Sequence, residues 1–70
     1  MNNVAETIRT IINTNGLKNK AVAERAGYTE KKFSRILTGL SPMRSDDILR
    51  IAHALDVTPN DLFGITNSKN

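Results

Sequence analysis

The hydrophobic residues of this chain recur with helical spacing in separate segments along the sequence. Val4, Ile8, Ile11 and Ile12 follow the i, i+4, i+7, i+8 pattern of one buried stripe, which predicts a helix over about residues 3–13. Similar stripes predict four more helices, over about 19–26, from the N-cap Thr29 to about 37, from about 45 to 55, and from 58 to about 63. We therefore expect an all-α fold of five helices without strands.

Residues with special backbone preferences mark the ends of these segments. Gly27 and Gly39 are expected to end the second and third helices, and Thr29 is a good N-cap for the third. Ser45 is predicted as the N-cap of the fourth helix, because two acidic residues suited to a helix N-terminus follow it. Residues 58–61, Thr-Pro-Asn-Asp, resemble a capping box and are expected to start the fifth helix.

The spacing between the second and third helices is typical of a helix-turn-helix over residues 19–38. Ala23 is small enough for the third helix to pack closely, and Gly27 can take the positive φ of a tight reversal. Phe33 and Ile36 are predicted to face inward and to fix the crossing of the two helices.

Positive charge is concentrated in this same region. The net charge is +3, but residues 18–35 contain six Lys or Arg and two Glu, a balance of +4, which leaves −1 for the rest of the chain. Such a basic cluster is either a solvated helix face or a surface for a polyanionic partner.

The sequence lacks the residues that several other classes of function require. The chain has no cysteine and one histidine, His53, which we expect on the exposed side of the fourth helix. There is no paired carboxylate site, no phosphate-binding loop and no cysteine nucleophile, so we expect no enzyme activity, no metal site and no cofactor. The sequence also lacks a signal peptide and an apolar run of about 20 residues, which predicts no membrane association and a cytoplasmic location.

The sequence resembles the lambda-repressor-like, Cro/CI-type (XRE family) DNA-binding domains. The resemblance is carried by residues 16–17, 22–29, 33–36 and Gly39, and it continues through residues 51–63, so that it covers about residues 5–63. It implies a single five-helix helix-turn-helix domain over 1–70, with a core of about 3–64 and a frayed tail at 66–70. Two departures stand out: Lys18 occupies a position where the family has a side-chain cap, and Leu37 and Thr38 replace an acid and an asparagine.

The resemblance also implies residue roles, because in this family the third helix enters the major groove of double-stranded DNA. The matching positions for reading bases are Glu30, Lys31, Lys32, Ser34 and Arg35. Those for contacting phosphates are Lys18, Asn19, Lys20, Tyr28, Thr29 and Arg44. Two alternatives stay open: Glu30 can simply complement its helix dipole, and Tyr28 can pack over the turn.

The expected function is that of a transcriptional repressor that binds an inverted-repeat operator as a homodimer. Apolar candidates for the dimer contact are Leu40, Met43, Phe63 and Ile65. For the loop residues among them, the alternative is that they cover the base of the third helix. No small-molecule ligand is indicated. The rival function is a protein-binding module, an antitoxin or inhibitor that sequesters a partner protein.

Overall fold

The computed structural model describes residues 4–63 and contains five α-helices over that range, with no strand. The helices are α1 Val4–Thr14, α2 Asn19–Ala26, α3 Glu30–Leu37, α4 Ser45–Leu55 and α5 Pro59–Phe63. The prediction of an all-α, five-helix fold is confirmed. Ile65 and the tail 66–70 lie outside the described residues.

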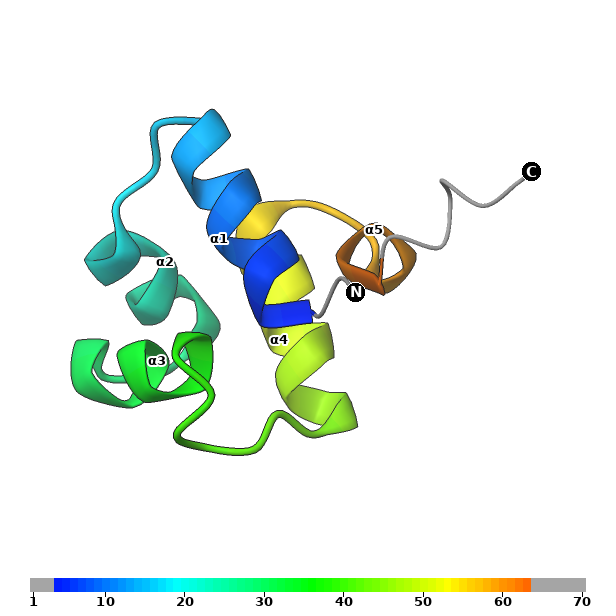
Figure 1. Cartoon of the computed structure of the whole chain (residues 1–70). Helices are drawn as coiled ribbons and strands as arrows, with labels where there is room; N and C mark the ends of the chain where they lie inside the picture. Colours follow the sequence, from blue (N-terminus) through cyan, green and yellow to red (C-terminus); the bar gives the residue numbers. More distant parts are fainter. Residues whose placement is uncertain (1–3, 64–70) are drawn as a thin grey trace.

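One hydrophobic core holds the five helices together. In Figure 1, α1 lies across α4, with α2 and α3 on one side of this pair and α5 on the other. Each helix contributes a side chain that is fully buried: Ile8, Ala23, Phe33, Ile51 and Leu62, each 0% exposed. The full burial of Ala23 explains its size, since a larger side chain would push α3 away from α2.

The turn between α2 and α3 fixes the geometry of the helix-turn-helix. Gly27 has φ 88°, a left-handed conformation that glycine adopts without steric penalty. The N–H of Tyr28 donates to the carbonyl of Ala23 at 2.8 Å, and that of Gly27 donates to Glu24 at 3.2 Å, as in a Schellman motif. Two residues later, the Oγ1 of Thr29 accepts from the backbone N–H of Lys32 at 3.1 Å and caps α3.

The start of α4 differs from the sequence-based prediction. Ser45 is the first residue of the helix, and Arg44 occupies the N-cap position instead. The Oδ2 of Asp47 accepts from the backbone N–H of Arg44 at 3.0 Å, so a side chain inside the first turn satisfies the N-cap amide. The prediction of Ser45 as N-cap is therefore wrong, because Asp47 supplies the acceptor and the helix begins one residue earlier. At α5 the capping box is confirmed by reciprocal bonds between Thr58 and Asp61, at 2.9 and 3.2 Å.

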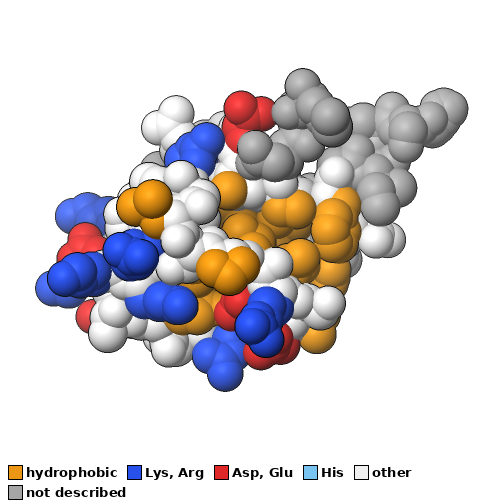
Figure 2. All heavy atoms as spheres, turned by 60° about the horizontal axis from the view of Figure 1, so that its bottom comes forward, with side chains coloured by type: hydrophobic (Ala, Val, Ile, Leu, Met, Phe, Trp, Pro, Cys, Tyr) orange, Lys and Arg blue, Asp and Glu red, His pale blue; other side chains and the backbone are white. Residues whose placement is uncertain are grey.

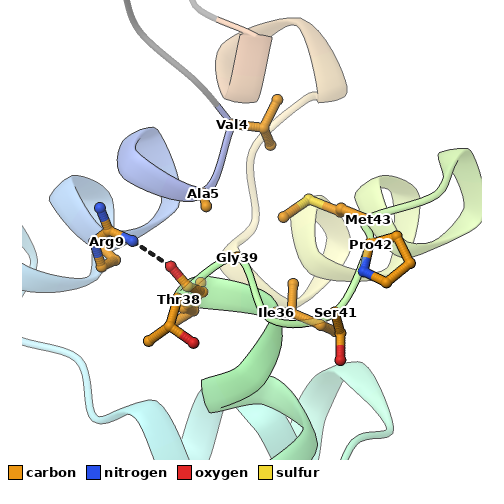
Figure 3. Close-up of a pocket in the computed structure, with 10 residues that line it drawn as sticks. Val4, Ala5, Arg9, Ile36, Thr38, Gly39, Ser41, Pro42 and Met43 are labelled. Atoms are coloured by element: carbon orange, nitrogen blue, oxygen red, sulfur yellow. Dashed lines mark hydrogen bonds between the residues drawn. The ribbon is translucent and has the colours of Figure 1, made fainter.

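Both departures from the family pattern have visible structural consequences. Lys18 is the N-cap of α2 and its side chain makes no capping hydrogen bond. At the other end of the motif, the guanidinium of Arg9 in α1 donates to the carbonyl of Leu37, the bond marked in Figure 3. The Oγ1 of Thr38 donates to the carbonyl of Ser34 at 3.0 Å. The end of α3 is thus satisfied by Arg9 and Thr38.

Candidate nucleic-acid interface

The third helix has one buried face and one exposed polar face. Phe33, Ile36 and Leu37 are buried in the core, which fixes the rotation of α3 about its axis. All five predicted base-reading residues are exposed: Glu30, Lys31, Lys32, Ser34 and Arg35. Four of them, all except Lys32, line one hollow of the surface together with Asn19 from the start of α2. The fold therefore brings side chains from α2 and α3 to one polar surface.

Four of the predicted phosphate-contacting residues lie at the N-terminal ends of two helices, α2 and α4. Lys18, Asn19 and Lys20 are exposed at the start of α2, and Arg44 is exposed just before α4. Figure 2 shows Lys and Arg side chains gathered on the side of the molecule where Figure 1 places α2 and α3. Because no side chain caps α2, its first backbone N–H groups are available to an anion, which such groups bind well. The oxygen of Thr29, by contrast, is used in capping α3.

Tyr28 is half-buried and is engaged inside the protein. Its hydroxyl donates to the Oδ1 of Asp47. Its ring stacks on Phe33 with centroids 6.2 Å apart, and the guanidinium carbon of Arg50 lies 5.8 Å from the ring centroid. A hydroxyl has one hydrogen to donate, so Tyr28 could donate to a phosphate only by giving up Asp47. In this structure Tyr28 packs over the turn, which is the alternative that the sequence left open.

Asp47 and Arg50 were not identified as site residues from the sequence. Asp47 was expected only to complement the dipole of its helix, and its partner Tyr28 is 19 residues away. Tyr28 and Asp47 come into contact only because α4 packs against the α2–α3 turn. No local sequence pattern predicts that packing.

The pKa values of Tyr28 and Asp47 are both shifted, so the stability of the protein depends on pH. The Tyr28 hydrogen bond, followed by that from the Arg44 backbone, lowers the pKa of Asp47 below its ordinary value. Burial, together with the bond to Asp47, raises the pKa of Tyr28. A lowered carboxyl pKa contributes stability above about pH 4, and this contribution is lost as the pH falls through the folded-state pKa. A raised tyrosine pKa contributes stability below about pH 10 that is lost at higher pH.

We predict that Asp47→Asn lowers the free energy of unfolding by about 1 kcal/mol at neutral pH, because it removes a charged acceptor. The difference from the wild type should shrink well below pH 4, where the wild-type carboxyl becomes neutral as well. Urea unfolding followed by circular dichroism at a series of pH values measures this. A difference that stays constant across the acid range would contradict the role given to the charge of Asp47.

The described residues include exposed apolar side chains that could serve as contacts between copies. Leu40 is 68% exposed and Phe63 is 46% exposed, as a contact residue requires. Met43 instead is partly buried against the core and lines the cavity between α1 and the α3–α4 loop shown in Figure 3.

Leu49, which is 58% exposed, was not identified from the sequence as a candidate contact residue. With Ile48, Pro59, Phe63 and Ser45 it lines an apolar hollow between α4 and α5. Leu49 lies off the buried stripe of α4, and this position in the sequence could have identified it as an exposed apolar residue.

Residues 4–63 contain neither a candidate metal site nor a candidate membrane span. No three His, Cys, Asp or Glu side chains in that range lie close enough to hold a metal ion. None of its helices is long and apolar enough to cross a membrane.

A family of domains and a solved structure both match this chain. No curated protein sequence shows a significant match to the chain. The chain is similar in structure to the restriction-modification controller protein C.AhdI from Aeromonas hydrophila, with a TM-score of 0.80 and 25% sequence identity. The match covers 86% of this chain and 91% of that one. Residues 4–62 match the sequence pattern of the helix-turn-helix domain family. The chain therefore belongs to the helix-turn-helix domain family, and it has the lambda-repressor-like fold that its sequence resembles.

Proposed function

We propose that this chain is a transcription regulator that binds double-stranded DNA with sequence specificity, by placing the first turns of α3 in the major groove. The observation that carries the proposal is the exposed polar face of α3, held in place by a buried face on the same helix. Its side chains suit base edges. Arg35 and Lys31 can donate to the O6 and N7 of guanine, and Glu30 can accept from the N4 of cytosine. Lys32 and Ser34 complete the base-reading set.

The phosphate contacts position α3 without reading sequence. Lys18, Asn19 and Lys20 reach the DNA backbone from the start of α2, and Arg44 reaches it from the start of α4. Thr29 and Tyr28 are the weaker members of the set, because the oxygen of Thr29 caps α3 and the hydroxyl hydrogen of Tyr28 is given to Asp47.

Two copies are proposed to bind an inverted repeat, with half-site centres about 10 bp apart, one turn of the double helix. A single small domain contacts few base pairs, and twofold symmetry doubles the contact. The exposed Leu49 and Phe63 between α4 and α5 are the apolar residues best placed for the contact between copies, with Leu40 as a further candidate. By occupying its operator the dimer acts as a repressor. The similarity to a protein described as a controller supports a regulatory role.

The salt dependence of binding tests this proposal. Three cationic contacts per copy, from Lys18, Lys20 and Arg44, predict that log K falls against log salt with a slope of about −5 for a dimer and about −3 for a monomer. Fluorescence anisotropy with a labelled DNA duplex gives the slope. Arg25→Ala, which removes an exposed charge of α2 that is outside the proposed contacts, is the control and should leave the slope unchanged. Weak binding without a salt slope would instead favour the protein-binding alternative.

A further inference from the structure

The carboxylate of Asp47 joins two separate segments of the protein. Its Oδ1 accepts from the hydroxyl of Tyr28 in the α2–α3 turn, and its Oδ2 accepts from the backbone N–H of Arg44 at 3.0 Å. Arg50 lies over the ring of Tyr28 and favours the charged form of Asp47. One half-buried carboxylate thus holds the turn that precedes α3 and the residue that precedes α4 at a fixed separation.

Both ends of this bridge lie beside proposed DNA contacts. Tyr28 comes two residues before Glu30, where α3 begins, and its ring stacks on Phe33 inside that helix. Arg44 is itself a proposed phosphate contact. The two hydrogen bonds of Asp47 therefore link the base-reading turn of α3 directly to the residue that makes this phosphate contact. Preorganised spacing matters because several contacts must reach one rigid DNA duplex at the same time.

We infer that Asp47 is a positioning residue for DNA binding: it orients the first turn of α3 and the Arg44 side chain relative to one another. This inference rests on the proposed function. It also predicts a change in DNA affinity opposite to the change that the loss of a negative charge alone would cause. Removing a negative charge from a small DNA-binding domain should strengthen binding, since charges within about 10 Å act on each other at 0.1 M salt. Positioning requires the opposite result at Asp47.

Asp46 supplies the matched control. It is the preceding residue in the same first turn of α4, carries the same charge and is exposed. Asp46→Asn and Asp47→Asn therefore remove equal charge from neighbouring positions. Asparagine has one acceptor oxygen in place of two, so it cannot accept from Tyr28 and Arg44 through separate oxygens as the carboxylate does, and any bond that it keeps to Tyr28 is between neutral groups. Tyr28→Phe removes one end of the bridge while keeping the stacked ring and the charge.

The experiment measures the anisotropy of a labelled mixed-sequence DNA duplex between about 0.05 and 0.2 M KCl. Each variant is measured at a temperature where circular dichroism shows that it is fully folded, so that a loss of stability does not affect the measured affinity. We expect Asp46→Asn to bind as tightly as the wild type or more tightly. Asp47→Asn and Tyr28→Phe should bind about threefold to tenfold more weakly, the equivalent of about one hydrogen bond.

Arg44→Ala identifies the contact that is lost, because it leaves the backbone N–H of Arg44 in place. It should reduce the salt slope of the wild type by about one, as expected for one phosphate contact. In the Asp47→Asn background it should reduce the slope no further, because the contact is already lost. A purely structural role for Asp47 would not produce this result in a fully folded protein.

Two results would overturn the inference: tighter binding by Asp47→Asn, as for Asp46→Asn, or wild-type affinity in Tyr28→Phe. If Asp47→Asn does not fold, Tyr28→Phe takes its place, both alone and combined with Arg44→Ala, because loss of a direct Tyr28 contact would leave the Arg44 contribution to the salt slope intact. Failure of the wild-type protein to bind the duplex would overturn the proposed function instead, and it is seen before any variant is measured.

Discussion

Replacing Phe33 with alanine should remove a large part of the stability of this domain, with a loss of about 3–5 kcal/mol in the free energy of unfolding. A domain of 70 residues has a total stability of about 4–10 kcal/mol, so the loss amounts to at least about a third of that stability, and at the low end of the range it unfolds the variant. The reason is position: Phe33 is 0% exposed, lies on the inward face of α3 and stacks on Tyr28. Its removal leaves a cavity where α3 meets the core. Thermal and urea unfolding followed by circular dichroism measure the loss.

The second phenylalanine of the chain provides the control. Phe63 is 46% exposed at the end of α5, so Phe63→Ala should cost about 1 kcal/mol or less at a protein concentration where the wild type is monomeric. Equal losses in the two variants would contradict the placement of Phe33 at the centre of the core. A Phe33→Ala protein with wild-type stability would contradict the packing of α3 altogether.

Replacing Arg35 with alanine should weaken binding to the preferred DNA site by about 1–3 kcal/mol, a factor of about 5–150, and should relax the preference at one base pair. Arg35 is exposed on the polar face of α3, and its guanidinium can form two hydrogen bonds to a guanine. Its backbone carbonyl, which accepts from Leu40 and Ser41, is unaffected by the substitution, so α3 should keep its place. Competition between the preferred site and single-base variants measures both effects.

Lys20→Ala and Arg25→Ala are the matched controls for Arg35→Ala, since each removes one exposed positive charge from α2. Lys20 is a proposed phosphate contact, so its loss should weaken all DNA sequences about equally. Arg25 faces a hollow with Leu49, Arg50 and His53, so its loss should change little. If Arg35→Ala weakened the preferred site and unrelated DNA equally, as Lys20→Ala should, Arg35 would be a phosphate contact and not a base-reading residue.

The elements of the fold that could be predicted are those that several local signals specify together. The α2–α3 turn has Gly27 at a positive φ, Thr29 as a capping side chain and the inward stripe that contains Phe33, and each signal points to the same geometry. The start of α5 is similar, because the reciprocal bonds of Thr58 and Asp61 lie within four residues. The prediction failed by one residue at α4, where two acceptors, Ser45 and Asp47, compete to satisfy the N-terminus.

The parts of the site that could not be predicted depend on contacts between distant segments. Tyr28 meets Asp47 only because α4 packs against the turn, so its hydroxyl is engaged where the sequence left two roles open. Leu49 becomes notable only when Phe63 of α5 is placed beside the same hollow. The roles of the side chains toward DNA are not set by the fold alone, and they stay predictions.

Selection of bound sequences from a random pool of double-stranded DNA tests the central proposal most directly. The wild-type chain, at about physiological salt, should enrich one motif made of two inverted half-sites with centres about 10 bp apart. The symmetry of that motif reports the dimer, and its conserved positions report the bases that α3 reads. A pool that remains random after selection at this salt concentration would contradict sequence-specific DNA binding by this chain.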